Sequence, residues 1–540
     1  MHLLIAIAAL AALATAQLPK NVSGGPLQPD QACYDVRHYT LRLDVVPETK
    51  SISGSLVMRA TALGKGPRLA LDLDPAFEVA AVELNGARVE FVHANGRITF
   101  APPTWPETGK DFEVTVRYGG APHVAVNPPW NGGFTWAQTK DGKPWIATSC
   151  QGEGGDLWWP CKDHPSDKPD GVDLFITVPE GLTVASNGTM RGEPRVEGGR
   201  ATFHWCEAQP ISNYCVALNI APYVLLKDTF ECVDGTRMPI EFFVLPESAE
   251  KARRCMPQFL DHLRVFEHLL GPYPFRSEKY GIAETPFLGM EHQTIIAYGN
   301  GFRDEQYDWL HNHELAHEWW GNLVTCRDWK DMWIHEGFGT YMQPLYKEIR
   351  FGRQAYQREM VRQRTIDRAA IAPREVKTSQ QIYFGPGGSN DIYNKGSWVL
   401  HTLRYELGDE KFFTLLRRFC YPTPALEKAT DGSQCRLVDT DDFVAMCSEV
   451  AGEDMAWFFE VYVRQPHLPT LSASLDDGLL KIRWTTPGDL PFHLDVPVIL
   501  GGKEVRVPMT GGHGELRVGD REYRVDPDRR VLAKRGEGLK

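Results

Sequence analysis

The chain has 540 residues, of which 42% are hydrophobic and 24% charged, so we expect a packed multidomain protein and exclude a disordered one. Its formal net charge is −12. Because binding to nucleic acid requires a basic face, this charge argues against nucleic acid as a main partner. Small molecules, peptides and proteins remain as ligand classes.

The N-terminus combines an apolar run at residues 3–13 with a small-x-small pattern, Ala14-Thr15-Ala16. This pattern predicts a cleaved export signal at residues 1–16, with a short membrane anchor or an ordinary apolar N-terminus as the alternatives. No later stretch approaches 18 consecutive apolar residues, so we expect no stable membrane span in the mature chain. An exported protein, periplasmic or extracellular, is therefore predicted.

The 11 cysteines form an odd set without repeating spacing. This usage predicts mostly free thiols with at most one or two bridges. Cys206 and Cys215, or Cys420 and Cys435, are close enough in sequence to pair, but the sequence alone does not assign a pairing.

The first third of the chain consists of short alternating segments such as "YTLRLDVV", "FEVTVRYGG" and "DLFITVP", separated by Gly, Pro and Asn. Alternation with a period of two between turn residues is typical of antiparallel β structure. We therefore predict an N-terminal antiparallel β domain at residues 17–226.

Helical spacing begins near Glu247, with a first helix that ends at Gly271. Further helices are expected at residues 305–324, 336–350, 353–371, 395–418 and 440–464, interrupted by a Gly-rich loop at 383–396. Alternation returns after residue 469. The predicted fold is α+β and multidomain, with a mainly helical domain at 227–467 and a small β-sandwich-like module at 468–540.

A metal site is indicated by the segment H-E-L-A-H at residues 313–317. His313 and His317 are four residues apart, so both imidazoles lie on one face of a helix and can share one Zn²⁺. Two histidines at this spacing also arise by chance, and His292, His311 and His335 lie nearby in sequence. Glu336, on a following helix, provides a third ligand and favours a zinc site with one open position.

The residues around these ligands predict hydrolytic chemistry. Zinc polarises a carbonyl oxygen and acidifies water, and Glu314 beside the first ligand could act as general base. The tetrahedral intermediate needs a donor for its oxyanion, for which Tyr393 is a candidate. Asp331 either orients a ligand histidine or caps the helix that carries Glu336.

With these motifs in order, the sequence resembles the gluzincin zinc aminopeptidases, peptidase family M1, which includes leukotriene hydrolase. "HELAHEWWGNLVT" and "WKDMWIHEGFGTY" resemble the zinc helix and third-ligand helix of the family, and "IYNKGSWVL" is similar to its catalytic tyrosine segment. The resemblance implies one zinc ion held by His313, His317 and Glu336, with Glu314 as base and Tyr393 as oxyanion donor. It also implies a β domain followed by a thermolysin-like catalytic domain.

Two further segments resemble the parts of the family that bind the substrate's amino end. "FLGMEHQT" at 287–294 is similar to the exopeptidase motif Gly-Ala-Met-Glu-Asn, which implies substrate contacts from Gly289, Met290 and Glu291. Leu288, Gly289 and His292 depart from that motif, which changes the wall beside the substrate. "SCQGEGGDLWWPCKD" implies a similar contact from Gln151, with Glu153 as the alternative.

We therefore predict a zinc metallo-aminopeptidase that acts on peptides with a free N-terminus. A free ammonium in a partly buried cleft needs a carboxylate partner, and Glu291 provides one. A thermolysin-like endopeptidase and a catalytically silent peptide-binding protein are the alternatives. The oligomeric state and the preferred side chain are not predicted.

Overall fold

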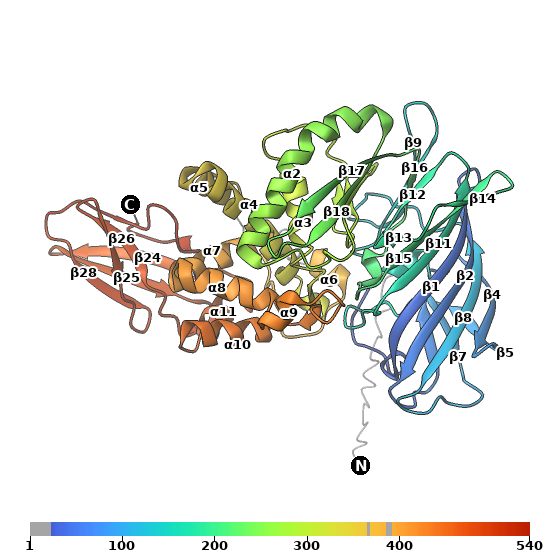
Figure 1. Ribbon diagram of the computed structural model, residues 1–540. Helices are drawn as coiled ribbons and strands as arrows, with labels where there is room; N and C mark the ends of the chain where they lie inside the picture. The colour runs from blue at the N-terminus through green and yellow to red at the C-terminus, as the bar shows by residue number, and fades with distance from the viewer. Residues whose placement is uncertain (1–22, 364–367, 385–390, 540) are drawn as a thin grey trace, which may run out of the picture.

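Figure 1 shows a computed structural model of the chain, in which residues 23–363, 368–384 and 391–539 are described. The predicted export signal at residues 1–16 lies outside the described residues, and export stays a prediction. Among the described helices, none is long and apolar enough to cross a membrane.

The N-terminal region is built around a large twisted sheet with the order β13-β15-β11-β1-β2-β8-β4-β5, to which β14 adds at β15. Burial alternates along β11, as expected for a strand with one face on the core. β1 pairs antiparallel with β2 but parallel with β11, so the predicted antiparallel domain contains one parallel pair. Its strands are β1 (Tyr34–Val46), β2 (Ser51–Ala62), β4 (Glu78–Leu84), β5 (Ala87–Val89), β8 (Asp111–Gly120), β11 (Val172–Pro179), β13 (Thr189–Met190), β14 (Arg195–Glu197) and β15 (Arg200–Glu207).

Two smaller sheets complete this region. One has the order β12-β16-β10-β9, and the other β3-β7-β6. The strands are β3 (Leu69–Asp72), β6 (Val92–Ala94), β7 (Arg97–Phe100), β9 (Gly133–Gln138), β10 (Pro144–Ser149), β12 (Thr183–Ala185) and β16 (Asn219–Ala221). β10 ends just before Gln151, so this strand brings the predicted substrate contact to the edge of the β region.

The middle of the chain combines a five-stranded sheet, β17-β18-β19-β21-β20, with a set of helices (Figure 1). The strands are β17 (Val224–Glu231), β18 (Arg237–Val244), β19 (Tyr280–Glu284), β20 (Gly289–Met290) and β21 (Ile296–Tyr298). The main helices are α2 (Ala249–Leu270), α3 (Trp309–Ala316), α4 (Trp333–Phe351), α5 (Arg353–Arg362), α6 (Ser379–Tyr383), α7 (Gly396–Leu407), α8 (Asp409–Cys420), α9 (Pro424–Lys428), α10 (Thr440–Ala451) and α11 (Ala456–Tyr462).

Four of the predicted helices were too long. The helices expected at 305–324 and 353–371 are the shorter α3 and α5, and those expected at 395–418 and 440–464 are each divided into two. Gly408 and Gly452 stand at these divisions with φ angles of 75° and 82°. This left-handed region suits glycine and ends a helix, which explains both breaks.

The C-terminal module contains a four-stranded sheet, β28-β25-β24-β30, and a three-stranded sheet, β27-β26-β29. Its strands are β24 (Thr470–Asp476), β25 (Leu479–Thr485), β26 (Val496–Leu500), β27 (Lys503–Val507), β28 (His513–Arg517), β29 (Tyr523–Val525) and β30 (Lys534–Arg535). The predicted α+β multidomain fold is thus confirmed. The individual domain boundaries stay predictions, and β17 crosses the one expected between residues 226 and 227.

All 11 cysteines are free thiols, most of them buried. Neither the Cys206–Cys215 nor the Cys420–Cys435 pairing occurs. The cysteines act as small apolar residues in the core.

Candidate metal centre and substrate cleft

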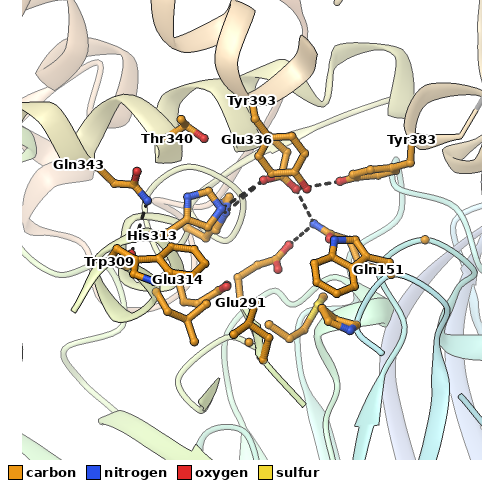
Figure 2. Close-up of a pocket in the computed structure, with 18 of the residues that line it drawn as sticks. Gln151, Glu291, Trp309, His313, Glu314, Glu336, Thr340, Gln343, Tyr383 and Tyr393 are labelled. Atoms are coloured by element: carbon orange, nitrogen blue, oxygen red, sulfur yellow. Dashed lines mark hydrogen bonds and ion pairs between the residues drawn. The ribbon is translucent and has the colours of Figure 1, made fainter. Parts of the chain in front are cut away.

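A cavity of about 480 Å³ lies where the turn after β10 meets helices α3 and α4. All the site residues predicted from the sequence line this cavity: Gln151, Gly289, Met290, Glu291, His313, Glu314, His317, Glu336 and Tyr393. Figure 2 shows how several of them converge. Segments far apart in the sequence therefore form one site.

Three ligand atoms meet at the centre of the cavity. The Nε2 atoms of His313 and His317 are 3.2 Å apart, and Glu336 Oε2 lies 3.6 Å and 3.4 Å from them. Although Glu336 Oε2 is buried, it has no hydrogen-bond partner among the described residues. A buried orphan oxygen facing two imidazole nitrogens fits the His₂Glu donor set of a catalytic zinc site, which keeps one position open.

Local structure fixes the orientation of the two histidine ligands. Asp308 caps α3 by accepting a hydrogen bond from the His311 N–H at 3.0 Å, and His317 ends the helix. His317 Nδ1 lies 2.9 Å from the Trp320 carbonyl oxygen, so this nitrogen donates and Nε2 faces the cavity. The structure contradicts both roles considered for Asp331, because its carboxylate instead pairs with Lys330 and accepts from Thr440.

The other nearby histidines are not part of the metal group. His311 contacts His262 and Tyr280, and His335 accepts a hydrogen bond from the Cys326 N–H. His292 is fully buried, and burial lowers its pKa to about 3. Within the described residues, only His313, His317 and Glu336 form a group that could hold a metal ion.

The electrostatics of the cavity favour a cation. Burial, followed by the charge of Glu291, raises the pKa of Glu314 well above its usual value. Burial also raises the pKa of Glu291 to about 7. Burial lowers the pKa of His317, but the hydrogen bond and charge of Glu336 outweigh it and bring the pKa to about 10. A site that attracts positive charge this strongly suits a divalent ion.

Tyr393 reaches the cavity because two glycines let its segment approach α4. A Cβ added at Gly337 would lie 2.9 Å from the Gly396 Cα, so only glycine permits this contact. Tyr393 lies just before Gly396, and its ring centroid is 6.0 Å from that of His313. Burial, and then the charge of Glu336, raises the pKa of Tyr393 well above its usual value, so the hydroxyl keeps its proton and can donate it.

Gln151 connects the β region to the metal group. Its Nε2 donates to Glu291 Oε1 at 2.5 Å and to Glu336 Oε1 at 3.0 Å (Figure 2). The Tyr214 hydroxyl also donates to Glu291 Oε1, at 3.1 Å. Glu153, the alternative to Gln151, instead accepts a hydrogen bond from the Gly132 N–H. Gln151 is therefore the residue of this segment that faces the ligands.

Gly289 and Met290 form the short edge strand β20, which pairs with β21 and places Glu291 in the cavity. A Cβ at Gly289 would approach Glu314 Oε1 to 2.8 Å and Leu310 Cδ1 to 2.7 Å. The departure from the family's alanine at this position therefore makes room for the Glu314 carboxylate.

The sequence analysis missed several residues of the cavity. The Tyr383 hydroxyl donates to Glu336 Oε1 at 2.9 Å. Trp130, Trp309, Thr340, Gln343, Gln363 and Phe384 also line the wall. A signal existed for two of them, since Thr340 and Gln343 follow Glu336 at helical spacing. Tyr383 had no comparable signal, because it comes from a different helix.

Two known family profiles match the sequence of this chain. The profile described as "Peptidase M1 N-terminal domain" matches residues 36–215, and that of the "Peptidase family M1 domain" matches residues 290–462. Together the two profiles cover more than half of the chain.

Relatives and solved structures point the same way. "Aminopeptidase M1" of Arabidopsis thaliana is 23% identical over 81% of this chain and 53% of its own, and "Leucyl aminopeptidase" of Saccharolobus solfataricus is 24% identical over 64% and 44%. The chain thus spans about half the length of these curated relatives. A crystal structure of a mutant M1 zinc metallopeptidase from Deinococcus radiodurans, bound to a Tyr-Ser-Ala substrate, has a TM-score of 0.67 at 24% identity, covering 83% of this chain and 98% of its own. A two-domain M1 zinc metallopeptidase bound to L-tryptophan has a TM-score of 0.67 at 25% identity, with the same coverage.

Proposed function

Because this chain belongs to peptidase family M1, we propose that it is a zinc aminopeptidase that hydrolyses the N-terminal peptide bond of peptides. One zinc ion per chain would be held by His313, His317 and Glu336. The relatives named as aminopeptidases and the peptide-bound structure of a similar fold support the proposal.

The position of Glu291 carries this proposal. Its carboxylate lies in the same cavity as the metal group and is joined to it through Gln151, which contacts both Glu291 and Glu336. A substrate ammonium at Glu291 would gain a charged hydrogen bond, whereas an internal peptide segment would leave this carboxylate without a charged partner. The cleft would thus select a chain's amino end.

The remaining residues of the site would each have a separate role in the reaction. When bound, zinc supplies Lewis-acid polarisation of the scissile carbonyl and acidifies water. Glu314 would take the proton of the attacking water, since its carboxylate follows the ligand His313 on α3 and lines the same cavity. The protonated Tyr393 hydroxyl would donate to the developing oxyanion, and Gly289 and Met290 would border the first residue.

A substrate panel tests the proposal. Peptides with a free amino terminus should be cut after the first residue, N-acetylated copies should resist, and a chelator should abolish activity until zinc is restored. Internal cleavage of acetylated peptides would support a thermolysin-like endopeptidase instead. Binding without turnover of any peptide would support a silent peptide-binding protein.

A further inference from the structure

The cleft has two chemically different ends. The aromatic end is formed by Trp130, Tyr383 and Phe384, of which Trp130 and Phe384 lie close to Gly152, the residue after Gln151. The amide end is formed by Thr340, Gln343 and Gln363. Figure 2 shows Gln151 and Tyr383 on one side of His313, and Thr340 and Gln343 on the other.

The amide end continues the face of α4 that carries Glu336. Thr340 and Gln343 follow Glu336 by four and seven residues, so the three side chains lie on one side of the helix. Gln363 Nε2 donates to the Thr340 carbonyl at 2.9 Å and to Gln343 Oε1 at 3.2 Å. Ser397 in turn donates to Gln363 Oε1 at 2.6 Å, which fixes the orientation of this amide.

These contacts leave hydrogen-bonding groups of Gln343 and Thr340 available to a ligand in the cavity. Gln343 Nε2 has only a long contact of 3.4 Å, to the Trp309 carbonyl. The Thr340 hydroxyl can donate or accept, and an amide offers two N–H donors and two lone pairs on its oxygen. A peptide unit has the matching pair, one N–H and one C=O. The half-exposed Trp309 provides an apolar wall beside them.

At this end, the described part of the cleft offers no cationic side chain. Of the lining residues that the structure describes, none is Lys or Arg. The acidic groups Glu291, Glu314 and Glu336 also line the cavity. A free carboxylate held at the amide end would be largely buried, unpaired and close to negative charge, which is costly.

We propose that the amide end binds the uncharged backbone of the residue that follows the scissile bond. The preferred substrates are then tripeptides, longer peptides and peptide amides, and free dipeptides are discriminated against. In a dipeptide the second residue ends in a carboxylate, which falls where the described side chains offer amides and a hydroxyl. This inference rests on the proposed aminopeptidase function, because Glu291 defines which end of the cleft holds the amino terminus.

The test compares leucyl-alanine, leucyl-alanine amide and leucyl-alanyl-alanine on the zinc-loaded wild-type chain. The amide and the tripeptide should have similar kcat/KM values, and the free dipeptide a value lower by about tenfold or more, chiefly through KM. Equal kcat/KM for the dipeptide and its amide would overturn the proposal. If none of the three is cut, the proposed function itself fails, so the two failures are distinguishable.

A charge-adding variant tests the location. Gln343→Lys places an ammonium at the amide end and should shift the dipeptide-to-amide ratio of kcat/KM toward the dipeptide by about tenfold. Gln354→Lys makes the same change at an exposed position of α5 and should leave the ratio unchanged. An identical ratio in the two variants would assign the discrimination to another part of the cleft and contradict the proposal. The wild-type comparison remains decisive if Gln343→Lys does not fold.

Discussion

The two sides of the cleft are held by different kinds of structure. The metal face, His313, Glu314, His317 and Glu336, comes from helices α3 and α4 and is almost entirely buried. The facing side comes from the turn after β10, which carries Gln151, and from the last residue of the short helix α6, Tyr383.

This difference follows from what each side has to do. Ligands and a general base need fixed mutual geometry, and rigid helices provide it. Side chains that contact a variable substrate can come from turns placed on that scaffold. Ser379 Oγ of α6 donates to the Gly152 carbonyl at 2.7 Å, which links the two segments of the facing side. The facing side is therefore one unit although its parts are far apart in sequence.

The largest effect should come from the metal face. Glu314→Gln should lower kcat by about 10²–10⁴-fold, because the base that accepts the proton of water is lost. Zinc content should stay at the wild-type level, since Glu314 is not in the ligand group. As a matched control, Glu153→Gln changes a carboxylate that contacts Gly132 and should have little effect. Wild-type kcat in Glu314→Gln would refute the assigned base.

Glu291→Gln should have the next largest effect and tests the binding of the amino end. Loss of a buried charge partner should lower kcat/KM for unblocked peptides on the order of a hundredfold. Activity on N-acetylated peptides should not fall with it, so the preference for a free terminus should shrink. Tyr214→Phe removes one hydrogen bond to Glu291 and should have a smaller effect of the same kind. A preference that survives Glu291→Gln would show that another group selects the amino end.

Tyr383→Phe tests whether the facing side supports the metal face. Because the Tyr383 hydroxyl holds Glu336 Oε1, its loss should weaken zinc binding by about tenfold, measured by competition with a chelator. Tyr341→Phe is the matched control, since Tyr341 bonds to Tyr356 and does not line the cavity. Unchanged zinc affinity with a lower kcat would make Tyr383 a substrate contact instead.

The same division explains what the sequence could predict. The helical period alone places His313 and His317 on one face, and a following helix with Glu336 completes the set, so the metal face was predictable. The contact between Tyr383 and Glu336 depends on how α6 packs against α4, which no local pattern encodes. Gln343 was missed for another reason, because a glutamine on a helix is usually solvated.

The fold shows the same limits. Alternation and helical spacing predicted the order of β, helical and β regions, because these patterns are local. The parallel pairing of β1 with β11 joins strands separated by most of the N-terminal region, and only tertiary packing decides it. Asp331 was interpreted from its position near Glu336, but its partner Thr440 is 109 residues away.

The smallest effect should come from a substitution of Asp163, near the segment that carries Gln151. Its carboxylate accepts a hydrogen bond from the Gly155 N–H at 3.0 Å. Burial, and then the charge of Asp72, raises the pKa of Asp163 to about 7. An acid whose folded pKa is raised is tolerated below its unfolded pKa, and its ionisation costs stability as pH rises toward the folded value. Asp163→Asn should therefore stabilise the chain at pH 8 by roughly 1–2 kcal/mol more than at pH 5. Thermal midpoints of both proteins at the two pH values measure this difference. A larger gain at pH 5 than at pH 8 would contradict the raised pKa of Asp163.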